Sequence, residues 1–266
     1  MGVGGVAWAQ APVLDEAAAL ARLVAAYPGP LCAVQAHAVR WCDGTVQPWE
    51  DGPGPADAPP DLRAPLAQPY PLAWPTLPPA LGQDPGRARN PAFFHKMYGR
   101  SAAEVARHLV NVPWLPKSQP PGRAVSLRVT TVNGVHERLR AVSDELDALP
   151  AALKARVLPQ VLRPAGGFMW RSVAGEARQS AHSWGIAVDM NTAWSDYWRW
   201  RDGPPRSGRT DDAPRWRNRI APEVVAAFER QGFIWGGKWH HYDTMHFEYR
   251  PELLAPQTGP ASALPR

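Results

Sequence analysis

Apolar positions recur at helical spacing in three stretches of the chain. Residues 14–27 form an amphipathic segment that ends at a proline–glycine–proline run, which predicts a helix. Residues 135–149 have the same periodicity and predict a second helix. A third is predicted over residues 222–231, with Pro222 in its first turn and Gly232 after its last residue. In addition, a capping-box pattern beginning at Ser101 predicts a short helix that runs to about Leu109.

Other stretches have the alternation and β-branched composition of strands. Residues 31–49 alternate in part and contain an Asp43-Gly44 turn, so they predict a small hairpin. Residues 124–132 are β-branched and end at Asn133-Gly134, which predicts a strand followed by a turn. Residues 167–173 and 185–190 are also predicted as strands.

The order of these elements predicts an α+β fold, because helices and strands mix without the strict βαβ alternation of a doubly wound sheet. Residues 51–90 are rich in proline and lack periodicity, as expected of a linker or of an extended segment wrapped over a surface. We therefore divide the chain into an N-terminal accessory segment (1–50), this proline-rich segment (51–90), a main domain (91–255) and a tail (256–266).

Composition and charge exclude several classes of protein. The net charge is +5, but the arginines form no basic stripe with interleaved aromatics, so nucleic acid is not an expected partner. No run of about 18 apolar residues is present, so no transmembrane anchor is expected. The N-terminus contains an Ala-Gln-Ala stretch but lacks a positively charged start, so it does not predict a complete signal peptide.

The chain has two cysteines, Cys32 and Cys42, and the sequence leaves two states open for them. They pair if the protein is exported, and they stay free thiols in a reducing compartment. Either way, a structural zinc site built from four thiolates is excluded.

Two short motifs carry candidate chemistry. The stretch SAHSWGIAVD holds His182 and Asp189, and DTMHFE holds Asp243 and His246. Taken alone, the first motif predicts a turn that leads into a strand, with His182 in a structural role. Together, the motifs offer what a hydrolytic zinc centre needs: three protein ligands, a free position for water and a nearby carboxylate. If a strand begins only after Met245, Asp243 lies in the preceding turn and can point to the same ion.

These motifs resemble those of the zinc peptidases that cut the peptide stems of peptidoglycan. SAHSWGIAVD matches the pattern S-x-H-x-x-G-x-A-x-D, and DTMHFE matches the D/E-x-x-H ending. The family includes D-alanyl-D-alanine carboxypeptidases, vancomycin-resistance D,D-dipeptidases and L-alanyl-D-glutamate endopeptidases, and its zinc site is shared with the hedgehog signalling domain. The resemblance covers residues 90–255, and the tracts FFHKMYGR, NGV and FIWGGKW are most similar to the endopeptidase branch.

The resemblance implies a fold and a set of site residues. It implies a small central antiparallel sheet, flanked by helices, that carries one Zn²⁺ per chain on His182, Asp189 and His246. Asp243 would be the general base, Ser180 would contact substrate, and Arg171 would stabilise the oxyanion. Many members have glutamate where this chain has Asp243, and the endopeptidase branch is similar to this chain in using aspartate.

The function implied by the resemblance is zinc-dependent hydrolysis of a peptidoglycan stem-peptide bond, most closely an L-alanyl-D-glutamate bond. The alternatives are a D-alanyl-D-alanine carboxypeptidase and a non-catalytic, zinc-stabilised domain that binds cell wall. Such a substrate lies in the periplasm or outside the cell, and it is the expected partner. The sequence does not determine the oligomeric state.

The sequence leaves the roles of several residues near the motifs open. A zinc-bound histidine needs an acceptor for its other ring nitrogen, and Glu248 and His241 are candidates. We expect Gly185 and Ala187 to let the backbone pass close to the metal. For His240 and His241, the sequence is equally consistent with exposed positions and with contacts at the site. The tryptophan-rich insertion, residues 193–219, reads as a packed surface loop or as one wall of a substrate groove.

Overall fold

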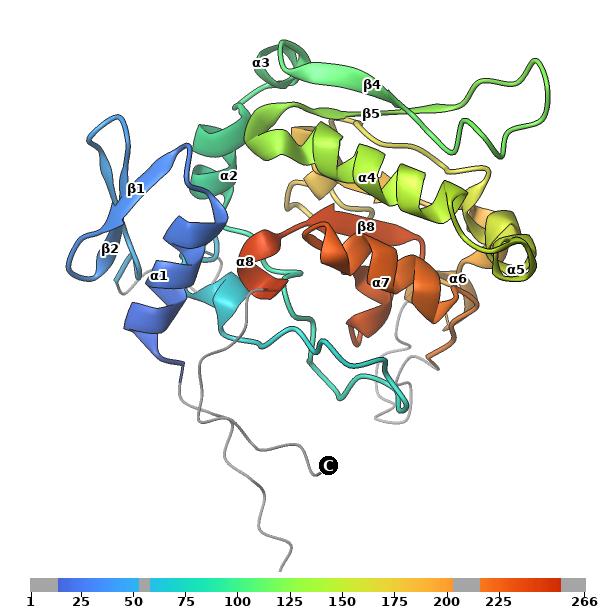
Figure 1. The fold of residues 1–266 in the computed structure, drawn as a ribbon. Coiled ribbons are helices and arrows are strands. Elements are labelled where there is room, and N and C mark those ends of the chain that lie inside the picture. The colour runs from blue at the N-terminus through green and yellow to red at the C-terminus, as the bar shows by residue number, and fades with distance from the viewer. Residues whose placement is uncertain (1–13, 53–57, 203–215, 255–266) are drawn as a thin grey trace, which may run out of the picture.

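The computed structural model describes residues 14–52, 58–202 and 216–254 (Figure 1). The Ala-Gln-Ala stretch, the tail and the middle of the tryptophan-rich insertion lie outside these ranges. The described residues combine helices with small antiparallel sheets, so the predicted mixture of helices and strands is confirmed at that level. The division of the chain into domains stays a prediction.

The N-terminal part is a helix packed on a three-stranded antiparallel sheet. Helix α1 (Glu16–Ala26) begins where the side chain of Asp15 accepts a hydrogen bond from the Ala18 amide, so the predicted helix is confirmed. The predicted hairpin is confirmed and gains a strand, since β1 (Leu31–Val34), β2 (Ala38–Trp41) and β3 (Val46–Pro48) pair in that order.

Cys32 and Cys42 form a disulfide that joins β1 to the residue after β2. Of the two states that the sequence left open, the structure therefore has the paired one.

The proline-rich segment runs over the surface of the molecule rather than away from it. Its only helical turn within residues 58–90 is the 3₁₀ turn η1 (Ala64–Leu66). Tyr70 is buried, and its hydroxyl donates a 2.6 Å hydrogen bond to Glu229. Lys238 holds the same segment by donating to the carbonyl of Pro71 at 2.7 Å. The segment is thus fixed against the C-terminal part of the chain at Tyr70 and Pro71.

A helical pair and a two-stranded sheet follow. Helix α2 (Pro91–Tyr98), which the sequence pattern did not predict, is capped by the side chain of Asn90. Ser101 caps the next helix as predicted, but α3 (Ala102–Ala106) is shorter than expected. The chain turns at Arg107 and enters strand β4 (Leu109–Pro113), which pairs with β5 (Ser126–Thr130). The apolar residues after Ala106 therefore belong to a strand and not to the end of a helix.

The third sheet carries the two motifs and is covered by helices. Its strand order is β6 (Ala187–Asp189), β8 (His246–Tyr249) and β7 (Phe233–Trp235), all antiparallel. The predicted helices are confirmed as α4 (Val135–Asp147) and α7 (Pro222–Arg230). Figure 1 shows both running across one face of β8. The remaining helices are α5 (Ala151–Val161), α6 (Trp198–Asp202) and α8 (Pro251–Leu254).

The predicted strand over residues 167–173 is wrong. The structure has only isolated bridges near this segment, between Gly166 and Asp189 and between Ser172 and Gln179. Its backbone amides donate hydrogen bonds to different segments: Phe168 donates to the carbonyl of Arg128 on β5, whereas Met169 donates to the carbonyl of His182. An extended segment that changes partners in this way forms no continuous ladder.

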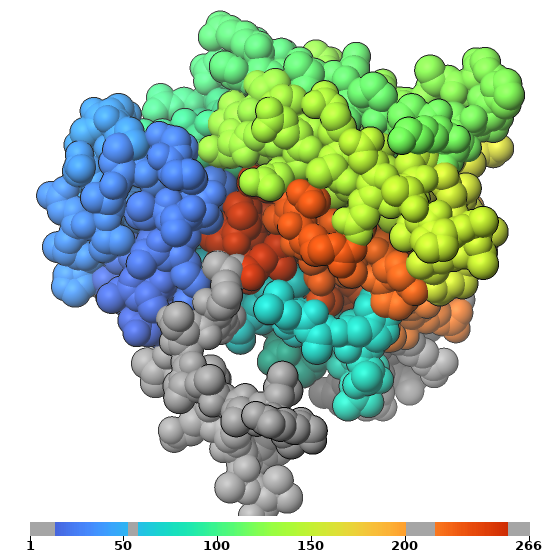
Figure 2. Space-filling view, in the orientation of Figure 1, coloured from blue at the N-terminus to red at the C-terminus, as the bar shows by residue number. Residues whose placement is uncertain are grey.

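One hydrophobic core connects these parts. Buried side chains of α1, α2, α4, α7 and the β6–β8–β7 sheet belong to a single cluster. In the space-filling view, the residues of α1 and the first sheet (blue) lie directly against α8 (red) (Figure 2). Within the described ranges, no helix has the length and apolarity needed to cross a membrane.

Candidate metal centre

The first motif folds as a tight turn that leads into a strand. Residues Ala181–Trp184 form the 3₁₀ turn η3, and Gly185 follows with a left-handed backbone (φ 68°) before β6 begins. The turn buries His182 at one end and the strand ends at Asp189. Seven residues therefore return the chain on itself, so that both side chains reach the same place.

Gly185 is required for a reason different from the one expected. A Cβ atom there would lie 2.7 Å from the Leu109 side chain and 3.0 Å from the Thr130 amide nitrogen. The close approach is to Leu109 on β4 and to Thr130 on β5, which donates a 2.9 Å hydrogen bond to the Gly185 carbonyl, and not to the candidate metal centre. The expectation that Gly185 gives room to the metal is wrong; the residue allows the left-handed turn and the contact with β5.

Antiparallel pairing places the second motif opposite the first. In the register of β6 and β8, Asp189 lies directly across from His246. The strand begins at His246, so Asp243 lies in the turn before it, where its carbonyl accepts from the His246 amide at 3.2 Å. The position expected for Asp243 is thus the one observed.

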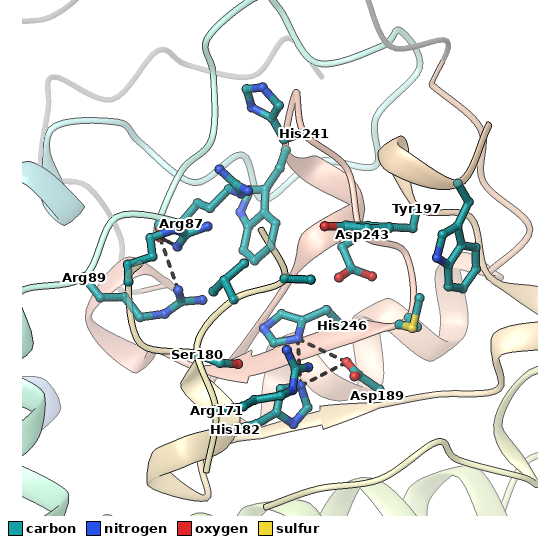
Figure 3. A pocket seen from close by; sticks show the side chains of 16 residues that line it. Arg87, Arg89, Arg171, Ser180, His182, Asp189, Tyr197, His241, Asp243 and His246 are labelled. Atoms are coloured by element: carbon teal, nitrogen blue, oxygen red, sulfur yellow. Dashed lines mark hydrogen bonds and ion pairs between the residues drawn. The ribbon is translucent and has the colours of Figure 1, made fainter. Parts of the chain in front are cut away.

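Three side chains converge at this edge of the sheet. Nε2 of His182 and Nδ1 of His246 lie 3.2 Å apart, and they lie 3.2 Å and 3.1 Å from the same Oδ1 atom of Asp189. These ligand atoms, one from each residue, all lie within 4.8 Å of one another (Figure 3). Two imidazoles and a carboxylate are a donor set that suits zinc. The cluster can therefore hold a metal ion.

Each histidine has an acceptor for its other ring nitrogen. Nδ1 of His182 lies 2.7 Å from the carbonyl oxygen of Gly167, and Nε2 of His246 lies 3.4 Å from Oε2 of Glu248. These contacts fix the ring orientations so that Nε2 of His182 and Nδ1 of His246 face the cluster. Of the two candidate acceptors, Glu248 lies at the site, whereas His241 instead contacts Asp84 at 2.6 Å.

The charges in the cluster shift one another's pKa values. Burial opposes charge on Asp189, but the two histidines hold the pKa of its carboxyl well below the usual range. Burial likewise opposes charge on His246, yet its contacts with Asp189 and Glu248 raise its pKa to about 9. Without a metal, the cluster therefore keeps a proton at neutral pH.

Asp243 has the electrostatic character of a general base. Burial, and then the charge of Asp189, raise the pKa of its carboxyl to about 6. Among the described residues, its buried Oδ1 atom has no hydrogen-bond partner. Figure 3 shows the Asp243 carboxylate facing the cluster from above His246. A carboxylate with one unpartnered oxygen and a raised pKa, beside a possible metal site, suits transfer of a proton from water.

A cavity of about 200 Å³ opens at the cluster, and both Arg171 and Ser180 line it. The two residues are linked, since the Ser180 amide donates to the Arg171 carbonyl at 3.0 Å. Ser180 is buried, whereas Arg171 is partly exposed; within the described part of the chain, its side chain donates only a long bond of 3.4 Å to the Ser172 carbonyl. The structure thus brings together all six residues that the sequence singled out. Their individual roles remain proposals.

The tryptophan-rich insertion contributes to the same cavity. Tyr197 and Trp200 line it, and Trp198 packs edge-on against His241. The interpretation of the insertion as a packed surface loop did not predict the short helix α6, which begins at Trp198. The described part of the insertion therefore forms a wall of the cavity.

His240 and His241 differ in their surroundings. His240 is buried, and its amide donates to the Gln83 carbonyl at 2.7 Å. His241 is anchored by Asp84 and lines the cavity. Neither belongs to the candidate metal cluster.

Sequence reasoning missed the arginines that line the cavity from outside both motifs. Arg87 and Arg89 lie in the proline-rich segment, and Arg178 lies just before the first motif. Arg87 and Arg178 both pair with Glu176, and these contacts hold the pKa of its carboxyl at about 2 although burial opposes this. No periodicity or motif marks these arginines, so no signal in the sequence could have found them.

Comparison with known families bears on the class of protein to which the chain is similar. A family model described as D-alanyl-D-alanine carboxypeptidase matches residues 174–249, which contain both motifs. No curated protein matches the chain. The match supports the predicted resemblance to the zinc peptidases of peptidoglycan, and it indicates a peptidase. It does not separate a carboxypeptidase from an endopeptidase.

Proposed function

We propose that this protein is a zinc-dependent peptidase that hydrolyses a peptide bond in the stems of peptidoglycan. The observation that carries the proposal is the convergence of His182, Asp189 and His246 beside Asp243, whose Oδ1 atom has no hydrogen-bond partner among the described residues. A purely structural site does not need such a base. The family match over residues 174–249 gives the class of substrate.

In this proposal the donor set fits one Zn²⁺ per chain, bound by Nε2 of His182, Nδ1 of His246 and a carboxylate oxygen of Asp189. Bound zinc would supply a Lewis acid and lower the pKa of a water molecule toward about 7. Asp243 accepts a proton from the attacking water at its free Oδ1 atom and then delivers it to the leaving amine.

The remaining proposed roles belong to residues that line the cavity. The Arg171 guanidinium donates one long bond, to the Ser172 carbonyl, and can turn toward the oxygen of the scissile carbonyl and hold its developing negative charge. Ser180 offers its hydroxyl to the substrate backbone from the buried rim of the cavity. Trp200 and Tyr197 close the other side and limit access of bulk water.

We further propose that the bond cut is the L-alanyl-D-glutamate bond. The support is the aspartate at position 243 and the tracts similar to the endopeptidase branch. The second candidate is a D-alanyl-D-alanine carboxypeptidase, which the description of the family model favours. A defined pentapeptide stem separates the two, because only the carboxypeptidase releases free D-alanine.

The disulfide favours a site of action outside the cytoplasm. A bond between Cys32 and Cys42 persists in an oxidising compartment, and the proposed substrate lies in the periplasm or beyond the cell. The non-catalytic alternative, a wall-binding domain that zinc only stabilises, predicts bound zinc without turnover. Incubation of the purified, zinc-loaded protein with stem peptides therefore tests the proposal, and wall binding without cleavage would favour that alternative.

A further inference from the structure

A buried chain of ionic contacts begins at the metal cluster and leads away from it. Glu248 lies two residues after His246 on β8 and is completely buried. Its Oε2 atom faces Nε2 of His246 at 3.4 Å, on the side of the ring opposite Asp189. Glu248 and Asp189 therefore contact this ring from opposite sides, and Glu248 is the one that leaves the metal-facing nitrogen free.

Glu248 is itself held by two buried arginines. Arg89 clasps the carboxylate with two nitrogens: Nε donates to Oε1 at 2.7 Å, and Nη2 donates to Oε2. Arg250 donates to Oε1 from the other side at 3.3 Å. The two guanidinium groups thus fix the carboxylate in position.

The chain of contacts continues into the N-terminal part of the molecule. Arg250 also donates to Glu252 at 2.5 Å and to the Gly86 carbonyl at 2.6 Å. Glu252 in turn accepts a 2.7 Å hydrogen bond from the hydroxyl of Tyr27, at the end of α1. Each of these side chains is at most 7 % exposed, so water does not replace the contacts.

Stability alone does not account for this arrangement. Apolar residues of similar volume commonly stabilise a fold as well as a buried ion pair does, because desolvation offsets much of the attraction. A bidentate arginine fixes the geometry of a carboxylate, and a carboxylate behind a ligating histidine fixes the ring and makes it a better donor.

We propose that Arg89 and Glu248 are positioning residues for the metal ligand His246. Arg89 acts through Glu248. Because Arg89 lies in the proline-rich segment, that segment helps to build the metal centre and is more than a linker between two parts of the chain. This inference rests on the proposed zinc site. It adds a residue from outside the span matched by the family model, which begins at residue 174.

Zinc affinity measured by competition with a chromophoric chelator tests this inference on the full chain. Removing such a carboxylate weakens metal binding by roughly 10- to 100-fold. Glu248→Gln keeps an acceptor oxygen but removes the charge, so its dissociation constant is expected to rise to the lower end of that range. The double variant Arg89→Met with Glu248→Leu removes both buried charges together and is expected to reach the upper end while remaining folded.

Glu229→Gln is the matched control. Glu229 also forms a largely buried ion pair, with Lys238, and accepts from Tyr70, but it does not contact the metal cluster. Its zinc affinity is expected to stay within twofold of the unmodified protein even if its melting temperature falls.

The outcomes separate this inference from the proposed function. Failure of the unmodified protein to bind zinc would contradict the proposed function. Tight binding by the unmodified protein with unchanged affinity in the folded double variant would overturn the positioning role alone. Equal weakening in Glu229→Gln would also overturn it, because general loss of stability would then explain the effect.

Discussion

Nε2 of His182 and Nδ1 of His246 face each other at 3.2 Å, and both lie within 3.2 Å of one carboxylate oxygen of Asp189. Two imidazole nitrogens this close repel unless a proton or a cation lies between their lone pairs. Without metal, the proton on His246 serves this purpose, which agrees with the raised pKa of that residue. In the proposed metal site, zinc and this proton would therefore compete for the same position.

The first prediction concerns this competition. Because the pKa of His246 is about 9 in the metal-free protein, zinc uptake at pH 7 is expected to release about one proton. Apparent affinity should rise by roughly tenfold per pH unit from pH 7 toward pH 9, where His246 loses its proton unaided. Calorimetry in two buffers of different ionisation enthalpy measures the release, and zinc binding without proton release would contradict the arrangement.

The same shift predicts how the metal-free protein responds to pH. The pKa of His246 in the folded state lies above the value of about 6.5 for an unperturbed histidine. Its contribution to stability is therefore complete below about pH 6.5 and is lost as the pH rises through about 9. The free energy of unfolding from urea titrations should fall over that interval, and His246→Gln should remove this part of the pH dependence.

Asp243→Asn tests the proposed base. The change keeps the shape of the side chain but removes its ability to take a proton, so the hydrolysis rate is expected to fall by roughly 10²- to 10⁴-fold. Zinc content should remain near one per chain, because Asp243 is not among the three clustered ligands. Undiminished hydrolysis by this variant would exclude Asp243 as the base.

Replacing both cysteines by serine should destabilise the N-terminal sheet without changing zinc affinity. The disulfide closes a loop with a sequence separation of 10, for which loop entropy predicts about 3 kcal/mol. Chemical denaturation measures this difference, and chelator competition gives the zinc affinity. A large loss of zinc affinity would show that the sheet and the metal centre depend on each other more closely than the contacts indicate.

Gly185→Ala tests the turn that brings His182 and Asp189 together. The new methyl group would meet Leu109 and Thr130 in addition to imposing a left-handed backbone on alanine, so we expect a loss of about 2 kcal/mol or more. Gly44→Ala is the matched control, since Gly44 has φ 89° but a methyl group added there would meet no other part of the chain within 4 Å. The difference between the two melting temperatures gives the part due to the contacts with Leu109 on β4 and Thr130 on β5.

The sequence contained enough to predict the candidate ligands but not what surrounds them. His182 with Asp189, and Asp243 with His246, are each close in sequence, and one antiparallel register joins the two pairs. Arg89 lies 159 residues from Glu248, and nothing in a proline-rich segment indicates a buried ion pair. Local patterns report short-range structure, whereas this contact depends on how the whole chain packs.

The errors in the predicted elements have the same origin. Residues 167–173 have a strand-like composition, but their hydrogen bonds go to different partners. The helix from Ser101 was expected to reach Leu109, but Leu109 belongs to β4 and pairs with Thr130 on β5. Helix α5 was missed, in part because it contains Pro159. In each case tertiary contacts override the local preference.

Mass spectrometry of peptidoglycan fragments is the most direct test of the central claim. Purified cell wall is digested with the metal-free protein, with the protein after one equivalent of zinc is restored, and with zinc-loaded Asp243→Asn. The account predicts fragments cut in the peptide stem only in the second sample, with new N-terminal D-glutamate ends if the L-alanyl-D-glutamate bond is cut. Stem cleavage that is equal with and without zinc, or none in any sample, would contradict it.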